Sequence, residues 1–348
     1  MQPRRPAPAP ARPRPGPLLA VGLAAVLVAA AASVLAGPAG GQAGPVAQPR
    51  TLHVSRAARP PGDGSAASPF ARVADAVAAA GPGDTVLVGA GTYAELLTTV
   101  RPGRPAAPIR IVGTPGARLV GPKGIDTGRL LQVLHDHITV ESLELSDANI
   151  LIRVEGASGV RIVGNRLHDA GGECVRLKSY AQKNELANNT ISGCGRVRFD
   201  LARDDKNGEG VYIGTAPEQS NGWPDRSDGN WVHHNRILPA AECVDVKERA
   251  RHNLVERNRC SGSDDPDGAG FSSRGDHTTF RGNRSTHHAG AGIRLGGDTA
   301  TQGLHNNVLG NTLADNAGYG LKVMRTPQGR IAANTIVRNR RGRTNRAS

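Results

Sequence analysis

The sequence has few aromatic residues: phenylalanine, tyrosine and tryptophan together make up 3% of its 348 positions. A core built around large aromatic side chains is therefore not expected. Beyond residue 137 the chain also lacks segments of helix length between its short apolar runs, so that region is predicted to be all-β. Glycine, by contrast, occurs 45 times, which indicates a chain with many tight turns.

The N-terminal region has the pattern of an export signal. Residues 1–17 are mainly Pro, Ala and Arg, and an apolar run of 19 residues follows from Leu18 to Ala36. Residues 1–36 are therefore predicted to be a signal peptide or, since the run just suffices to cross a bilayer, an N-terminal membrane anchor. The domain that follows is expected to be secreted, or anchored with the domain outside, and membrane contact is expected only if this segment is retained.

Cysteine is scarce, with four residues at positions 174, 194, 243 and 260. Outside the cell these residues could pair, and four cysteines allow three pairings. Cys260 is expected to point inward and Cys243 outward, so a bond between these two is not expected.

The formal net charge of +13 indicates an acidic partner. Part of the charge lies at the chain ends, where we expect a flexible linker over residues 37–50 and a basic tail over residues 338–348. The tail has no aromatic residues beside its arginines, so nucleic-acid binding is not expected. The folded domain is predicted to span residues 51–337 and to be a monomer.

A short phrase recurs beyond residue 137, namely an Asn followed two residues later by an apolar side chain. It occurs at Asn165, Asn189, Asn235, Asn258, Asn311 and Asn334, and Asn283 keeps the Asn without the apolar residue. The spacing is 23 to 28 residues, apart from 46 residues between Asn189 and Asn235. This period, with short β-like runs between turns, predicts a right-handed parallel β-helix with a stacked Asn ladder. The long interval predicts one rung that carries two long loops, a typical functional face.

An amphipathic helix is predicted before the repeats, with Ser68 as its N-cap and Gly81 as its stop, followed by a strand over 84–88. Such a helix resembles the cap that closes the first coil of parallel β-helices. The predicted fold is thus all-β, a single-stranded right-handed parallel β-helix with an N-terminal amphipathic capping helix.

Five segments align on the strand after each Gly-rich turn, and their alternation assigns the outward side chains. One outward column contains Arg176, Tyr212, Asp245, Ser272 and Arg294. The column beside it contains Lys178, Gly214, Lys247, Arg274 and Gly296, and the strand entrances hold Glu173, Glu209 and Glu242. Lys247 and Arg274 are therefore expected on adjacent rungs.

Two cations about 5 Å apart repel by about 3 kcal/mol at an effective dielectric of about 20, so Arg274 is expected to lower the pKa of Lys247. Asp245, Glu242 and Glu248 act in the opposite direction unless a metal occupies their carboxylates. From the charges alone, a solvated sheet face with mixed charges is the simpler interpretation.

Residues 241–283 resemble the core of polysaccharide lyase family 6, the group of chondroitinase B and alginate lyases. The resemblance rests on Glu242, five residues before Lys247, on Arg274 in "SSRGDHTTFRGN", and on "AGIRLGGD" at 291–298. It covers roughly residues 160–300. The chain departs from the family pattern at two positions. Ala240 stands where the family has a second acidic ligand, and Glu209 stands where the family has an Asn.

The resemblance implies a polysaccharide lyase that cleaves an acidic, uronate-containing glycan by β-elimination. Glu209 and Glu242 would hold Ca²⁺, with Asp204 or Asp205 as alternative ligands. Lys247 would take the proton at C5, and Arg274 would assist the departing oxygen. The residues implied to contact substrate are Arg176, Lys178, Tyr212 and Arg294.

Other interpretations remain open. A non-catalytic glycan-binding or surface-structural β-helix is the main alternative, and epimerisation, which begins with the same proton removal, is another. The loop at 263–268, "SDDPDG", could itself bind calcium. The histidines at 233, 234, 277, 287 and 288 have no standard zinc spacing and are interpreted as turn residues, with His277 as a possible groove residue.

Overall fold

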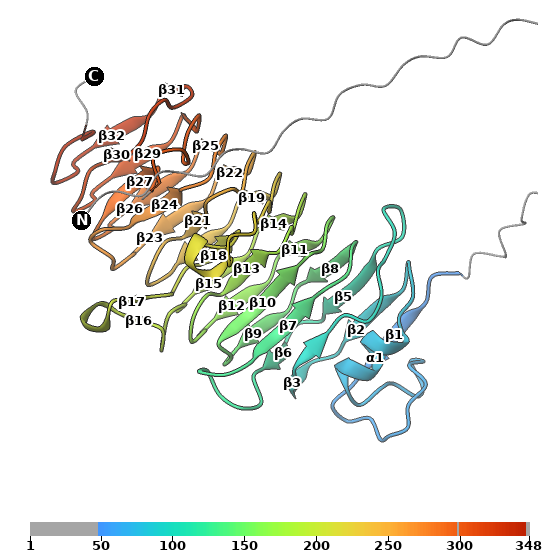
Figure 1. Cartoon of the computed structure of the whole chain (residues 1–348). Coiled ribbons are helices and arrows are strands. Elements are labelled where there is room, and N and C mark those ends of the chain that lie inside the picture. The colour runs from blue at the N-terminus through green and yellow to red at the C-terminus, as the bar shows by residue number, and fades with distance from the viewer. Residues whose placement is uncertain (1–47, 298, 346–348) are drawn as a thin grey trace, which may run out of the picture. The chain divides into compact units, whose positions relative to one another are not determined.

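The computed structural model describes residues 48–297 and 299–345. The expected signal peptide or anchor, and most of the expected linker, lie outside this range. The described residues form a parallel β-solenoid, in which three sheets run along the length of the domain (Figure 1). Within the same residues, no helix has the length and apolar character needed to cross a membrane.

Each coil between the two terminal ones contributes one strand to each sheet, and the described residues form sheets of eleven, ten and nine strands, named A, B and C. Sheet A contains β1 (Thr51–Val54), β2 (Thr85–Val88), β5 (Ile109–Gly113), β8 (Ile138–Glu141), β11 (Arg161–Val163), β14 (Glu185–Ala187), β19 (Trp231–His233), β22 (Leu254–Glu256), β25 (Thr279–Arg281), β28 (Asn307–Leu309) and β31 (Ile331–Ala332). Sheet B contains β3 (Gly91–Ala94), β6 (Ala117–Val120), β9 (Glu144–Ser146), β12 (Arg166–His168), β15 (Thr190–Ser192), β20 (Arg236–Leu238), β23 (Arg259–Ser261), β26 (Arg284–Thr286), β29 (Thr312–Ala314) and β32 (Thr335–Val337). Sheet C contains β4 (Leu97–Thr98), β7 (Arg129–Val133), β10 (Ile150–Glu155), β13 (Val175–Lys178), β18 (Val211–Ile213), β21 (Val244–Val246), β24 (Ala269–Ser273), β27 (Ala291–Leu295) and β30 (Leu321–Val323).

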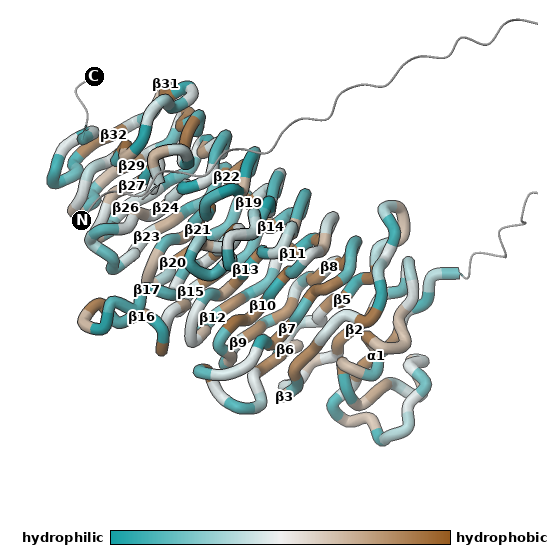
Figure 2. The backbone as a smooth tube through the Cα atoms, viewed as in Figure 1, coloured by the Kyte–Doolittle hydropathy of each residue, from teal (hydrophilic) through white to brown (hydrophobic). Residues whose placement is uncertain are grey.

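The core lies inside the coils and is mainly aliphatic. On β13 and β18 the inward residues Val175, Leu177, Val211 and Ile213 are all fully buried, as the alternation predicts. Hydrophobic residues follow the strands and hydrophilic residues the turns, most clearly between β2 and β12 (Figure 2). Stacking the same small aliphatic positions rung on rung explains how a chain with few aromatic residues builds a continuous core.

The predicted Asn ladder is confirmed. Asn189 Oδ1 accepts hydrogen bonds from the backbone and side-chain nitrogens of Asn165, at 2.9 and 3.1 Å, and Asn235 does the same for Asn189. Asn283 belongs to the ladder although it lacks the apolar partner. A second ladder at another turn, which the sequence analysis missed, begins with Asn184 and Asn230.

The helix is shorter than predicted. It is α1 (Val73–Ala79), at the N-terminal end of the solenoid, and buries Val73, Ala76 and Val77. Ser68 is not its N-cap, because the carboxylate of Glu95 accepts the N–H groups of Val73 and Ala74 at 2.9 and 3.1 Å. The helix therefore begins where a residue 22 positions away in sequence can satisfy its first donors.

The long interval is one rung, as predicted. Its first loop contains the antiparallel hairpin of β16 (Phe199–Asp200) and β17 (Asp205–Lys206), with the 3-10 turn η1 (Leu201–Arg203) between them. Strand β18 then joins sheet C between β13 and β21, and the second loop contains the 3-10 turn η2 (Pro217–Gln219).

The C-terminal coil extends past the expected boundary at residue 337. Asn339 accepts hydrogen bonds from Asn316, and Thr344 forms a parallel bridge with Leu321. Residues 338–345 thus continue the solenoid for part of a further coil.

Two disulfides join Cys174 to Cys194 and Cys243 to Cys260. The expectation that Cys243 and Cys260 do not pair was therefore wrong. Cys243 lies before β21 rather than within it, so strand alternation does not determine its direction, and its side chain is fully buried.

Candidate functional site

The outward column predicted from the sequence is present on sheet C. Arg176 on β13 pairs in register with Tyr212 on β18, and Tyr212 with Asp245 on β21. Asp245 pairs with Ser272 on β24, and Ser272 with Arg294 on β27. Because rungs are about 4.8 Å apart, these side chains form a row along the solenoid axis.

Lys247 and Arg274 follow β21 and β24 at equivalent positions, so they lie on adjacent rungs as expected. A cavity of about 470 Å³, here called the acidic cavity, opens beside them. Its walls come from sheet C and from the loops that flank it. The lining residues are Asp204, Asp205, Lys206, Asn207, Glu209, Tyr212, Glu218, Gln219, Glu242, Lys247, Asp265, Asp267, Arg274 and Arg294.

Asp245 joins the two cations. Its Oδ2 lies 2.5 Å from Nζ of Lys247 and accepts a hydrogen bond from Nη2 of Arg274 at 2.8 Å. Burial opposes the ionisation of Asp245, but Arg274 and Lys247 outweigh it and hold its pKa below the ordinary value. Asp245 was expected only to influence the pKa of Lys247, although its outward position was visible in "ECVDVK". The structure adds it to the site.

The expected lowering of the Lys247 pKa was wrong. Burial is the largest single influence and lowers this pKa, and Arg274 lowers it further, but Asp245, Tyr212 and Glu209 together raise it by more than these two lower it. The expectation rested on repulsion by Arg274, but a buried carboxylate oxygen of Asp245 lies 2.5 Å from the Lys247 ammonium nitrogen. In this arrangement Lys247 is an ammonium ion.

Tyr212 was expected to contact substrate, but its side chain is only 1% exposed. Arg176 and Lys247 lie over its ring, 4.5 and 4.2 Å from the centroid. Burial raises the pKa of Tyr212 to about 12, so its hydroxyl stays protonated. Tyr212 therefore supports the two cations and offers no free ring face for a sugar.

Glu209 and Glu242, the expected calcium ligands, do lie together. One oxygen each from Glu209, Glu242 and Asp245 lie within 4.8 Å of one another, and all three residues are buried. Burial, then Asp245 and Glu209, raise the pKa of Glu242 to about 8, and burial also raises the pKa of Glu209. In addition, Oδ1 of Asp245 has no hydrogen-bond partner within the described residues. A compact set of buried carboxylate oxygens with unmet bonding capacity fits a hard cation such as Ca²⁺.

The other expected substrate contacts are spread along sheet C. Arg294 lines the acidic cavity. Arg176 lines a neighbouring cavity, where it donates to Glu173 at 3.0 Å and to Gln219 at 2.5 Å. Lys178 lines neither of these two cavities.

The loop at 263–268 forms one wall of the acidic cavity. Lys206 on β17 lies 3.5 Å from Asp265 and 3.7 Å from Asp267. An ammonium group thus already faces the carboxylates that the sequence suggested as a second calcium site.

The histidines divide into two groups. His234, His277 and His287 have positive φ angles, which confirms them as turn residues. His233 instead lies in β19, and His288 is buried, where its Nδ1 accepts the N–H of Ser263. The turn interpretation was therefore wrong for His233, whereas His288 lies in the connection between β26 and β27.

Comparison with known proteins agrees with the fold. A family model described as a right-handed β-helix region matches residues 235–346. No curated protein sequence matches this chain. An alginate lyase from Paenibacillus sp. str. FPU-7 has a similar structure, with a TM-score of 0.68 and 20% identity over 82% of this chain and 99% of that chain. A pectate lyase is also similar, with a TM-score of 0.62 and 14% identity over 83% of this chain and 78% of that chain. A rhamnogalacturonan lyase has a TM-score of 0.60 and 13% identity over 85% of this chain and 86% of that chain. The chain therefore has the right-handed parallel β-helix fold found in these three lyases.

Proposed function

We propose that this chain is an exported polysaccharide lyase that cleaves an acidic, uronate-containing glycan by β-elimination. One observation carries the proposal: a single oxygen of Asp245 holds both Lys247 and Arg274 at a cavity whose wall also contains Glu209 and Glu242. The fold shared with three polysaccharide lyases is consistent with this activity.

In β-elimination, a base removes the proton at C5 of the uronate. The electron pair forms the C4–C5 double bond while the bond from C4 to the glycosidic oxygen breaks, and that oxygen takes up a proton. Lys247, once neutral, is the base, because this residue lines the cavity on the rung between those of Tyr212 and Arg274. The Arg274 guanidinium stabilises the departing oxygen directly or through a water molecule.

The charges around Lys247 suggest why the site needs a cation. Calcium held by Glu209, Glu242 and Asp245 would neutralise the substrate carboxylate and withdraw the negative charge that keeps Lys247 protonated. Without such compensation, the raised pKa leaves Lys247 unable to accept the C5 proton. The residues present therefore favour a calcium-dependent enzyme.

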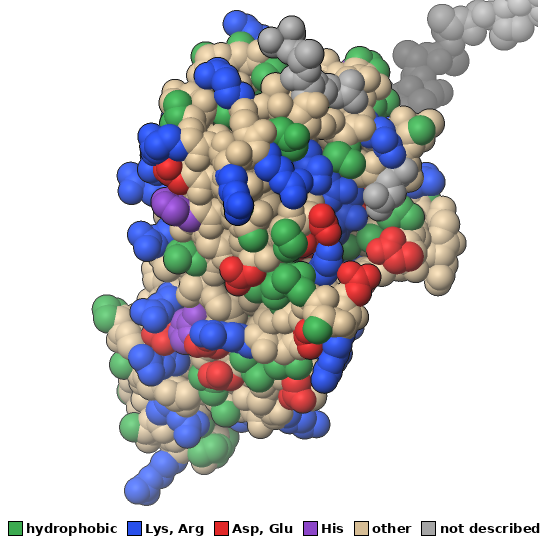
Figure 3. Space-filling model, turned by 90° about the vertical axis from the view of Figure 1, so that its left-hand side faces the viewer, with side chains coloured by type: hydrophobic (Ala, Val, Ile, Leu, Met, Phe, Trp, Pro, Cys, Tyr) green, Lys and Arg blue, Asp and Glu red, His purple; other side chains and the backbone are tan. Residues whose placement is uncertain are grey.

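Two further observations support the proposed partner and location. Lys and Arg side chains form a group on one face of the domain, with Asp and Glu side chains beside it (Figure 3), and such a surface attracts a polyanion. Both disulfides are compatible with an oxidising, extracellular compartment.

A second candidate is glycan binding without cleavage. The observation that favours it is the salt bridge from Lys247 to Asp245, which stabilises a cation in place of a base. The acidic cavity would then hold an acidic polymer through Arg274 and Arg294.

A substrate screen separates the two candidates. The purified domain is incubated with alginate, polygalacturonate and chondroitin sulfate, with calcium or with chelator, and ultraviolet absorbance reports the unsaturated product. A lyase gives calcium-dependent product with wild type and none with Lys247→Ala. Retention of a glycan without product on any of the polymers supports the binding candidate.

A further inference from the structure

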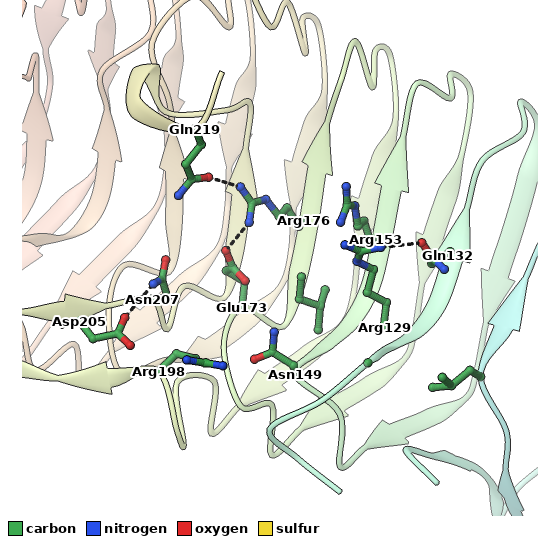
Figure 4. A pocket seen from close by; sticks show the side chains of 13 residues that line it. Arg129, Gln132, Asn149, Arg153, Glu173, Arg176, Arg198, Asp205, Asn207 and Gln219 are labelled. Carbon is green, nitrogen blue, oxygen red and sulfur yellow. Dashed lines mark hydrogen bonds and ion pairs between the residues drawn. The ribbon is translucent and has the colours of Figure 1, made fainter. Parts of the chain in front are cut away.

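A second cavity, of about 670 Å³, adjoins the acidic cavity on the side of the N-terminal coils. Figure 4 shows Arg129, Arg153 and Arg176 on neighbouring strands of sheet C, with Arg198 across from them beside the β16–β17 hairpin. We call it the arginine cavity. The lining residues are Leu96, Gly128, Arg129, Gln132, Asn149, Ile150, Arg153, Glu173, Arg176, Arg198, Asp205, Asn207 and Gln219.

The two cavities differ in charge. The arginine cavity is lined by four basic residues and two acidic ones, Glu173 and Asp205, which leaves an excess of positive charge. The acidic cavity is lined by four basic and seven acidic residues, so its formal charge is negative. A polyanion is therefore attracted to the arginine cavity by the protein alone, whereas the acidic cavity requires protonation or a bound cation.

Much of the hydrogen-bonding capacity of these arginines is unused. Neither Arg129 nor Arg198 forms an ion pair with any described residue, and Arg129 donates only to Gln132, at 3.3 Å. Arg153 and Arg176 each have one carboxylate partner, but their Nε atoms are buried without a hydrogen-bond partner in the described part of the chain. Arg129 and Arg198, which are exposed, therefore offer the guanidinium donors that a ligand in this cavity can reach most directly.

The two cavities adjoin each other. Asp205, Asn207 and Gln219 line both of them, and Gln219 also accepts a hydrogen bond from Arg176 at their junction. In the outward column, Arg153 on β10 pairs with Arg176, three rungs from Asp245. At about 4.8 Å per rung, a ligand must extend about 14 Å to reach both ends.

We propose that the arginine cavity is a second anion-binding site, which holds the oxyanion groups of the same linear polysaccharide at a distance from the bond that is cleaved. The proposal rests on the proposed function only for the identity of this polymer. Guanidinium groups bind carboxylate and sulfate oxygens through paired N–H donors, so either substituent fits. Leu96, which is 45% exposed at the rim, offers an apolar surface for a sugar ring.

The test measures binding in the Lys247→Ala background, where cleavage is blocked. Affinity for alginate, which carries only carboxylates, for chondroitin sulfate and for neutral dextran is compared with and without Arg129→Gln and Arg198→Gln. Both arginines are exposed, so the variants should fold, which their melting temperatures check. The matched control replaces Arg166 and Arg236, two exposed arginines on sheet B, by Gln.

The expected result is a loss of affinity of about tenfold or more for at least one acidic polymer, with the control pair unchanged. The polymer that loses more affinity identifies the preferred substituent, carboxylate or sulfate. Equal affinity in the Arg129/Arg198 and Arg166/Arg236 variants would overturn the proposal, as would an equal loss for dextran.

This experiment is independent of the lyase assay. If wild type cleaves no polymer but binding depends on Arg129 and Arg198, the proposed lyase activity fails and the arginine site stands. If wild type cleaves a polymer and the arginine variants bind it normally, the site fails and the activity stands.

Discussion

One carboxylate oxygen of Asp245 lies 2.5 Å from the ammonium nitrogen of Lys247 and 2.8 Å from the guanidinium of Arg274. A single buried anion is thus shared by two cations on adjacent rungs, and Lys247 also lies 3.4 Å from Glu209. Asp245 also offsets the repulsion between Lys247 and Arg274 at the acidic cavity, where water screens their charges little.

Removing this anion should destabilise the domain. Asp245→Asn leaves the buried Lys247 and the partly buried Arg274 without their shared partner, and we expect a loss of about 3 to 5 kcal/mol of unfolding free energy, measured by urea titration. Glu141→Gln, which breaks the exposed pair with Arg110, is the control and should cost less than about 1 kcal/mol. Similar losses in both variants would contradict the role given to Asp245.

The stability of the domain should depend on pH through Glu242. Its pKa is raised from 4.5 to about 8, so between these values the folded state holds a proton that the unfolded state has released. Folding stability from this group is therefore lost as pH rises from 4.5 towards 8. Glu242→Gln remains neutral, so in chelator its melting temperature should rise relative to wild type between pH 5 and pH 8. The control is Glu218→Gln, at an exposed residue in the wall of the same cavity. If the difference in melting temperature between Glu242→Gln and wild type does not change with pH, the raised pKa assigned to Glu242 is contradicted.

Calcium should stabilise the wild-type domain. At a free concentration about a hundred times Kd, binding to the folded state adds about 2.7 kcal/mol, measured as a rise in the unfolding midpoint that chelator reverses. Glu209→Gln combined with Glu242→Gln should abolish the rise. Asp265→Asn with Asp267→Asn should preserve it, and the opposite outcome would place the ion in the loop at 263–268.

The Asn ladder should account for a large part of local stability. Asn235 donates to Leu186, His233 and Asn258 and accepts from Asn189, all in the buried interior. Asn235→Ala leaves several buried polar groups unpaired, and each costs about 1 to 3 kcal/mol of folding free energy. We therefore expect the unfolding free energy, measured by urea titration, to fall by at least about 3 kcal/mol.

Asn334→Ala provides the comparison, because Asn334 ends the ladder and is only partly buried. Its loss should be clearly smaller than that of Asn235→Ala. An effect of equal size would mean that the ladder acts through something other than burial.

The repeat made most of the fold predictable. Alternation in segments such as "ECVDVK" fixes which side chains face outward, and the Asn spacing fixes the rung, so the column from Arg176 to Arg294 followed from the sequence. The same column extends to Arg153 and Gln132 on the two preceding rungs. Extending the alignment by two strands would have indicated part of the arginine cavity.

Three features could not be read from local sequence. The first helical donors are satisfied by Glu95, which only the fold brings near. Cys243 lies just before β21, outside the strand to which alternation applies. The sharing of Asp245 depends on which side-chain oxygen faces each cation, and that geometry reversed the expected pKa direction of Lys247.

The most direct test of the account is the calcium-dependent rate of unsaturated product formation by wild type, Lys247→Ala and the control Lys123→Ala on the most reactive acidic polymer. Because general-base catalysis contributes about 10² to 10⁴ in rate, Lys247→Ala should lose at least about a hundredfold in kcat/KM, while its affinity for the polymer and the activity of Lys123→Ala stay close to wild type. Near-normal cleavage by Lys247→Ala would contradict the assignment of Lys247 as the base.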